Sequence, residues 1–357
     1  MKQSDNKPGA PDKPAAGGLS RRGFVTGVAS LAGGTATLAA AASAGASTRC
    51  ESSPGCRTPG CDYDVLVVGG GFAGVTAARD LEKAGFKTLL IEARNRLGGR
   101  TFSTEFEGIP IELGGTWVHN TQPFVWAEIQ RYGIPVVETP GAVAEDMRFV
   151  MPDGRLVQPS AAQLEEVAIG WQTYCARSRD LLPRPYDLKH NREAVLQADS
   201  ISALDHLASL DLTPLQEHFI KTLISVFVNS HAEEMSYLEV LRFQVLAGDY
   251  FPTLMDATTR FKLDGGTGSL IEAIVEDGSV DYRLSTVVKS IKDSGKKVEV
   301  TTTRGEVINC GAVISTVPMN TISRISFEPP LPAGVVEAGN ARHPGRGMKM
   351  FLKVRGD

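Results

Sequence analysis

Residues 64–74 decide the fold, and they read Asp64-Val65-Leu66-Val67-Val68-Gly69-Gly70-Gly71-Phe72-Ala73-Gly74. The apolar run before the glycines is short, continuous and rich in β-branched residues, which predicts a strand buried on both faces of a parallel sheet. Helical apolar spacing follows the glycines, and Gly85 ends the predicted helix. A second predicted strand, residues 87–91, leads directly to the acidic residue Glu92.

Each part of this strand, turn, helix and strand has a physical task in holding a dinucleotide. Gly69 permits a tight turn, Gly71 lets backbone N–H groups approach a pyrophosphate, and Gly74 allows the helix to pack closely. The helix N-terminus presents partial positive charge to the phosphates. Glu92, 18 positions after Gly74, is placed to accept hydrogen bonds from a ribose diol. The spacing predicts a dinucleotide-binding, Rossmann-like α/β domain and leaves FAD and NAD both open.

Composition and charge exclude several classes of protein. A chain of 357 residues is expected to hold about two domains. With 42% hydrophobic and 22% charged residues it is typical of globular proteins rather than disordered or multi-span membrane proteins. Residues 62–357 contain 30 basic and 38 acidic side chains, a net charge of −8, which disfavours nucleic acid and favours a small-molecule partner. The Cys and His spacings match no metal-binding pattern, so no metal site is predicted.

The amino-terminal residues predict an export signal. Ser20-Arg21-Arg22-Gly23-Phe24-Val25 precedes an uncharged Ala/Gly-rich stretch that ends near residue 46 with small-residue cleavage sites. This segment resembles a twin-arginine signal, so residues 1–46 are expected to direct the protein to the periplasm or outside the cell, with 47–62 as a linker. A membrane anchor is the weaker alternative because the stretch is poor in Leu, Ile and Phe, and no stable membrane span is predicted. An oxidising compartment would permit one disulfide among Cys50, Cys56 and Cys61.

Three further motifs identify a family resemblance. Arg94-Asn95-Arg96-Leu97-Gly98-Gly99-Arg100-Thr101 resembles the R-x-G-G-R-T segment of flavin-containing amine oxidases. Residues 112–119, which include Gly114-Gly115-Thr116-Trp117-Val118, resemble that family's G-G-x-[YW]-V segment. Residues 265–270 resemble its G-G-x-x-x-L element. The chain is similar to monoamine oxidases, in particular to bacterial nicotine and pseudooxynicotine amine oxidases that are exported by twin-arginine signals.

The resemblance implies FAD as the cofactor and a set of site residues. Those expected to bind FAD are Gly69, Gly71, Phe72, Ala73, Gly74, Glu92, Ala93, Arg94, Gly99, Arg100, Gly114, Gly115, Thr116, Trp117 and Val288. Lys349 is expected to reach the reactive flavin nitrogen through a water, with a solvated lysine as the alternative. Trp117, Phe227, Tyr250 and Thr259 are candidate substrate-pocket residues. Trp117 could equally be a core aromatic, and the sequence alone favours core packing for the other three.

The resemblance also implies the domain organisation. Residues 63–140 and 261–330 are expected to form the FAD-binding domain of the amine oxidase fold, with 141–260 and 331–357 forming a helical plus β-sheet substrate domain. Helices are predicted over 161–179, 201–209, 213–229 and 236–246, and strands over 280–284, 287–292, 297–303, 311–317 and 347–354. The family pattern continues beyond Asp357, so the chain is expected to be truncated at its carboxyl end.

The implied reaction is transfer of a hydride from the carbon next to an amine nitrogen to FAD, with hydrolysis of the resulting imine and oxygen or an electron carrier as acceptor. Two alternatives stay open. One is another flavin oxidoreductase, of the L-amino-acid oxidase or desaturase type. The other is a non-catalytic FAD-binding fragment. The sequence leaves the oligomeric state open.

Overall fold

A computed structural model describes residues 59–143, 147–151, 153–343 and 345–355. Contacts divide the chain into a unit of residues 1–53 and a unit of residues 54–357, and every described residue belongs to the second unit. The predicted twin-arginine signal and most of the predicted linker therefore lie outside the described residues. In the part that is described, no helix is long and apolar enough to cross a membrane.

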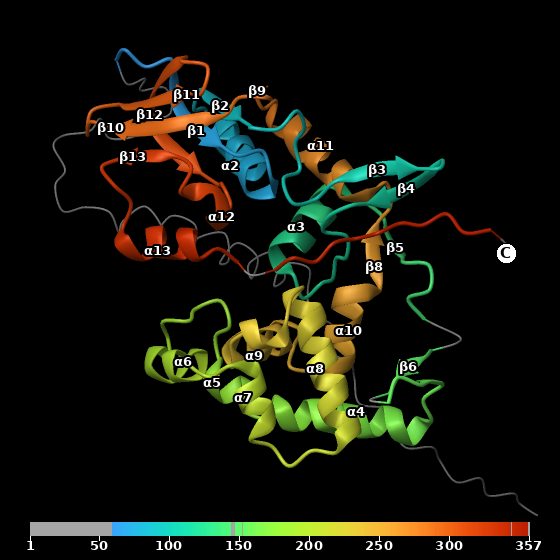
Figure 1. Cartoon of the computed structure of the whole chain (residues 1–357). Helices are drawn as coiled ribbons and strands as arrows, with labels where there is room; N and C mark the ends of the chain where they lie inside the picture. The colour runs from blue at the N-terminus through green and yellow to red at the C-terminus, as the bar shows by residue number, and fades with distance from the viewer. Residues whose placement is uncertain (1–58, 144–146, 152, 344, 356–357) are drawn as a thin grey trace, which may run out of the picture. The chain divides into compact units, whose positions relative to one another are not determined.

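The centre of the fold is a seven-stranded mixed sheet in the order β13-β10-β11-β12-β1-β2-β9 (Figure 1). Strand β1 lies between β2 and β12 and is parallel to both, whereas β10, β11 and β12 form an antiparallel meander. The bounds are β1 Tyr63–Val68, β2 Thr88–Ile91, β9 Tyr282–Arg283, β10 Val288–Asp293, β11 Val298–Thr302, β12 Val307–Ser315 and β13 Ser326–Glu328. The predicted α/β class is confirmed, and the sheet takes strands from two distant parts of the chain.

Strand β1 is buried on both faces, as its continuous apolar sequence predicts. Leu66 and Val68 pack with the apolar side chains of β10, β11 and β12. Val67 points to the opposite face, where it packs with helices α2 (Phe72–Lys83), α3 (Pro123–Tyr132) and α11 (Gly266–Gly278). Alternate residues of one strand therefore belong to two separate apolar cores.

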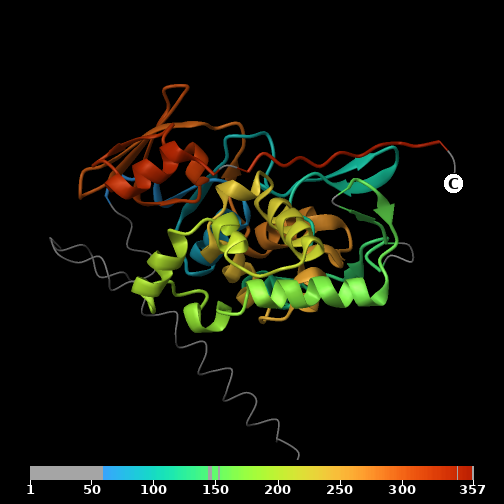
Figure 2. The ribbon, with the colours of Figure 1, turned by 60° about the horizontal axis from the view of Figure 1, so that its bottom comes forward.

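A group of helices that lies between β2 and β9 in the sequence has its own core around Trp171 and Tyr174. Figure 2 shows its long helix α4 side-on. The helices are α4 Ala161–Tyr174, α5 Ser178–Leu181, α6 Arg192–Asp199, α7 Ala203–Ala208, α8 Pro214–Val228, η2 Ala232–Glu234, α9 Tyr237–Leu246 and α10 Phe251–Thr259. Thr213 caps α8 with a capping box, as a Thr-Pro opening predicts. The predicted single helix over 161–179 is wrong, because α4 ends at Tyr174 and α5 begins at Ser178.

Short elements complete the fold. Strands β3 (Ser103–Phe106) and β4 (Ile109–Glu112) form a hairpin, β5 (Val136–Glu138) pairs with β8 (Phe261–Leu263), and β6 (Phe149–Val150) pairs with β7 (Leu156–Val157). Helices α12 (Met319–Ile322) and α13 (Ala333–Ala341) follow β12.

The last described residues correct one prediction. Residues 347–354 form no strand, because no backbone hydrogen bonds pair them with a described strand. Figure 1 shows them as an extended segment along the β3–β4 hairpin. There the Lys353 ammonium donates to Glu107 at 2.8 Å.

One buried hydrogen bond fixes the helical core, and it yields the first prediction. The indole N–H of Trp171, which is fully buried, donates to Oε1 of Gln244 at 2.9 Å. Gln244→Leu keeps the volume but leaves that N–H without an acceptor, so we expect the free energy of unfolding to fall by about 1–3 kcal/mol. Urea unfolding followed by circular dichroism measures it. The matched control is Gln197→Leu on the exposed side of α6, which should change stability by less than about 0.5 kcal/mol. Equal effects of the two substitutions would contradict the role of Gln244.

Candidate functional site

A cavity of about 640 Å³ opens at the carboxyl ends of β1 and β2, where open α/β sheets bind their ligands. Its walls come from the glycine turn after β1, the residues after β2, the loop 98–101, the start of β10 and the segment after β12. The predicted residues that line it are Gly69, Gly71, Phe72, Ala73, Glu92, Ala93, Arg94, Gly99, Arg100 and Val288. The fold therefore gathers ten of the predicted cofactor residues around one space.

The glycines of the turn have different structural tasks. Gly69 has a φ of +110°, and a Cβ at Gly74 would lie 1.8 Å from the Gly69 carbonyl oxygen, so neither position accepts a side chain. At Gly71 a Cβ would meet nothing in the protein closer than 3.8 Å, although Gly71 lines the cavity. Gly74 therefore serves the packing of α2, whereas Gly71 keeps the cavity open for a ligand.

Gly70, which the spacing rule passes over, is also constrained. Its Cβ would lie 2.6 Å from Cδ2 of Leu97, and its N–H donates to Oε2 of Glu92 at 2.7 Å. The other carboxylate oxygen, Oε1, accepts from the N–H of Arg94 at 2.8 Å. Glu92 is only 7% exposed, so backbone amides rather than water hold its charge. Each oxygen keeps a second lone pair, which a ribose hydroxyl can use.

Three arginines give the cavity its charge. Arg94, Arg100 and Arg324 line it, and within the described chain none of their guanidinium groups has a hydrogen bond or an ion pair. Uncompensated guanidinium groups beside a helix N-terminus are suited to bind a diphosphate. Arg324 was missed in the sequence because it follows Gly74 by 250 positions and belongs to no motif.

Thr316 is a second residue that the motifs did not reveal. Its hydroxyl lies 3.0 Å from the carbonyl oxygen of Val68 and 3.1 Å from that of Gly69, and it donates to them. It therefore ties the end of β12 to the glycine turn. No local sequence signal marks this residue, because its role depends on the pairing of β12 with β1.

The predicted residues Gly114–Trp117 form a second group, which the structure does not place in the wall of the 640 Å³ cavity. This group adjoins the cavity through Arg100, whose carbonyl oxygen accepts from the N–H of Gly115 at 3.1 Å. A Cβ at Gly114 would lie 2.1 Å from that same oxygen, so the approach requires glycine.

Lys349 joins this second group from the carboxyl-terminal segment. Its ammonium donates to the carbonyl oxygens of Gly114 at 2.6 Å and Glu112 at 3.5 Å, and to the Thr116 hydroxyl. It also lies 4.8 Å from the centre of the Trp117 ring, a cation–π distance. Desolvation lowers the pKa of Lys349, and the charge of Glu112 opposes this shift. The predicted strand position is wrong, but the structure brings Lys349 to the predicted flavin-side segment.

Glu112 is a further buried acid that was not predicted as a site residue. Its carboxylate accepts from the N–H of Thr267 at 2.6 Å, from the Thr267 hydroxyl at 2.9 Å and from the Ser103 hydroxyl at 2.5 Å. A carboxylate at the N-terminus of α11 stabilises the helix dipole. Glu112 thus fixes α11 to the hairpin that leads to Gly114.

Three candidate substrate residues lie elsewhere. Phe227 packs in the helical core, with ring centroids 5.1 Å from Phe243 and 6.0 Å from Trp171. Tyr250 is 58% exposed at the start of α10, and the exposed Thr259 donates its hydroxyl to the Met255 carbonyl oxygen. None of the three lines the cavity, whereas Trp117 contacts Lys349. In the part of the chain that the structure describes, no group of three or more acidic, His or Cys side chains is placed to hold a metal ion.

Comparison with known proteins identifies the class. The sequence profile of flavin containing amine oxidoreductases matches residues 72–357. The chain therefore belongs to this family.

Two Pseudomonas proteins are similar to the chain over most of its length. The chain is 36% identical over 344 residues to pseudooxynicotine dehydrogenase from a Pseudomonas species, covering 95% of this chain and 69% of the relative. It is 35% identical to nicotine dehydrogenase from Pseudomonas putida, covering 95% of this chain and 70% of the relative.

Two solved structures share the fold. Putrescine oxidase bound to putrescine has a TM-score of 0.63 at 24% identity, covering 76% of this chain and 62% of that one. Cyclohexylamine oxidase from Brevibacterium oxydans has a TM-score of 0.66 at 18% identity, covering 78% and 63%. The chain thus spans less than two thirds of either solved protein, and these similarities describe its fold.

The two glycine roles give the second prediction. We expect the unaltered protein to release about one FAD per chain on denaturation. Gly71→Ala should leave the melting temperature unchanged but weaken FAD binding about tenfold, because its Cβ enters only the ligand space. Gly74→Ala should lower the free energy of unfolding by about 1–3 kcal/mol, because its Cβ overlaps the turn. Flavin absorbance and thermal unfolding measure both effects. Full FAD binding by Gly71→Ala would contradict this division of tasks.

Proposed function

We propose that this chain is an FAD-dependent amine oxidase whose cofactor occupies the 640 Å³ cavity. The observation that carries the proposal is the combination, around one space, of a glycine turn before α2, the buried carboxylate of Glu92 and three guanidinium groups that have no partner in the described part of the chain. Membership of the flavin containing amine oxidoreductase family supports it.

Different residues bind different parts of the cofactor, according to the charge of each part. Arg94, Arg100 and Arg324 neutralise the diphosphate, and the first residues of α2 offer it backbone amides. Glu92 accepts hydrogen bonds from the adenosine ribose. Val288, 7% exposed at the start of β10, offers its backbone to the adenine. Gly114–Trp117 then flank the flavin ring beyond Arg100.

When bound, FAD supplies the acceptor for a hydride that leaves the carbon next to an amine nitrogen. The resulting imine is hydrolysed by water, and oxygen or an electron carrier takes up the electrons. The names of the two Pseudomonas relatives support an alkaloid amine as the substrate class. Trp117 provides an aromatic wall for such an amine beside Lys349.

Lys349 is proposed to position water beside the flavin. Its three N–H donors all face protein acceptors, so a water competes with the Thr116 hydroxyl or with the distant Glu112 carbonyl at 3.5 Å. Desolvation lowers the pKa of Lys349, which strengthens the hydrogen bond that its ammonium donates to such a water.

The third prediction concerns this lysine. Amines should bleach the flavin absorbance of the FAD-loaded protein under anaerobic conditions. Lys349→Met should slow this bleaching about tenfold or more, because the water that Lys349 positions beside the flavin would lose its donor. Lys353→Met is the matched control, because its side chain is 70% exposed and its ammonium pairs, among the described residues, only with Glu107.

Stopped-flow absorbance gives the rates, and FAD content must be equal in the three proteins. Unchanged bleaching by Lys349→Met would remove the lysine from the mechanism. A protein that binds FAD but is bleached by no amine would support the non-catalytic alternative.

We also propose export to the periplasm or beyond by the twin-arginine route, supported by Arg21-Arg22 and the small-residue stretch after them.

The fourth prediction is that replacing Arg21-Arg22 by Lys-Lys keeps the precursor in the cytoplasm. Cell fractionation and immunoblotting measure this, with Lys7→Arg as a control outside the motif. Normal export of the Lys-Lys variant would refute the route and leave the enzymatic proposal untouched.

A further inference from the structure

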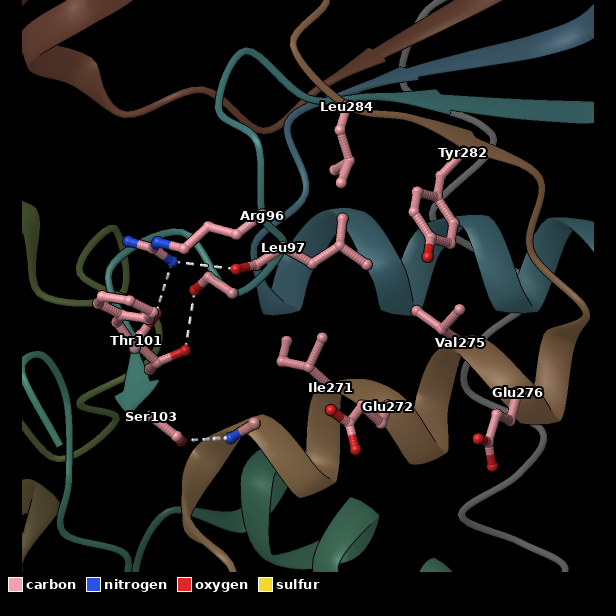
Figure 3. Close-up of a pocket in the computed structure, with 13 residues that line it drawn as sticks. Arg96, Leu97, Thr101, Ser103, Ile271, Glu272, Val275, Glu276, Tyr282 and Leu284 are labelled. Atoms are coloured by element: carbon pink, nitrogen blue, oxygen red, sulfur yellow. Dashed lines mark hydrogen bonds between the residues drawn. The ribbon is translucent and has the colours of Figure 1, made fainter. Parts of the chain in front are cut away.

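A second cavity, of about 410 Å³, lies between residues 96–103, helix α11 and the residues around β9 (Figure 3). It is separate from the cofactor cavity, but Gly98 and Thr101 line both. The segment 98–101 is therefore a thin wall with a cavity on each side.

The lining of this second cavity combines an apolar floor with an acidic rim. Leu97, Ile271, Val275 and Leu284 supply the apolar part, and Ile271 is only 5% exposed. Glu272 and Glu276 project from successive turns of α11, and Tyr282 stands on the opposite wall (Figure 3). Within the described residues neither carboxylate has an ion pair or a side-chain hydrogen bond.

Arg96 is the one positive residue in the lining of this cavity, against the two carboxylates. The guanidinium of Arg96 donates to the carbonyl oxygens of Leu97 at 3.0 Å, Thr101 at 3.1 Å and Gly99 at 3.1 Å. It also stacks on the Phe102 ring at 4.2 Å. Arg96 is thus fixed in the loop and keeps its positive charge, and the two carboxylates outweigh it, so the lining has a net charge of −1.

We propose that this cavity binds an organic cation with an apolar body, such as a protonated amine. The apolar floor takes the body, and Glu272 and Glu276 take the cationic group, with the face of Tyr282 available for a cation–π contact. A volume of about 410 Å³ lies at the small-ligand end of the range for binding pockets. The site is distinct from the oxidation site and concerns binding alone.

The shared wall couples the two cavities. The N–H of Gly98 donates to the Gly70 carbonyl oxygen at 2.8 Å, and the Thr101 hydroxyl donates to the Gly98 carbonyl oxygen at 2.8 Å. Gly98 has a φ of +98°, and a Cβ there would lie 2.8 Å from the Thr101 carbonyl oxygen, so the wall is expected to move as one unit.

A cation in the second cavity restrains the wall and changes FAD affinity, and linkage requires FAD to change the cation's affinity by the same factor. This coupling rests on the proposed function, whereas the cation site does not.

The fifth prediction tests the site with benzyltrimethylammonium, a quaternary cation that has no nitrogen lone pair and cannot be oxidised to an imine. Calorimetric titration of the whole chain, with FAD removed, should show one saturable site. The double variant E272Q/E276Q should bind the probe about tenfold or more weakly. Glu337→Gln is the matched control, because Glu337 is an exposed carboxylate on α13 that has no ion pair among the residues that the structure describes. Circular dichroism shows whether each variant is folded.

Absence of saturable binding, or wild-type affinity in the double variant, would overturn the site. The same titration at saturating FAD tests the coupling, and equal probe affinities with and without FAD would overturn it. A chain that binds the probe but no FAD would refute the proposed function alone, so the two failures are distinguishable.

Discussion

The contact between Gly74 and the Gly69 carbonyl oxygen fixes the start of helix α2 against the end of strand β1. No side chain fits between them, so the turn has one available geometry. Thr316 adds the end of β12 to the same turn by donating to Val68 and Gly69, and Glu92 adds the end of β2 by accepting from Gly70. Three chain segments thus meet at one point, and the cofactor cavity is the space that remains beside it.

The charges at the site are held in two contrasting ways. Glu92 and Lys349 are satisfied mainly by backbone groups, which position each charge without neutralising it. The three cavity arginines have no partner in the described chain, so their positive field is fully available to an anion. A site built this way is arranged before its ligand arrives and needs little reorganisation to bind it.

Local features could be read from the sequence, and distant ones could not. Strand β1, the glycine turn and Glu92 lie within 30 residues and have one physical explanation, so their order predicts the cavity. Caps such as Thr213 also mark their helix directly. Arg324 and Thr316 reach the cavity only because β12 pairs with β1, which no local pattern reveals. Residues 347–354 show the opposite error, because their sequence predicts a strand that the structure does not contain. A strand needs a neighbouring segment to complete its backbone hydrogen bonds, and the local pattern does not reveal whether that segment is present.

The position of β1 between β2 and β12 also means that the sheet can be completed only late in synthesis. Thr316 lies 248 positions after its partner Val68, so during synthesis β1 and β2 emerge long before β12. Until then one edge of β1 and the apolar faces of Leu66 and Val68 have no cover. Such late closure of a parallel sheet is slow and leaves a nascent chain open to aggregation. The cofactor cavity, whose wall includes Thr316 and Arg324, can therefore form only after β12 has paired with β1.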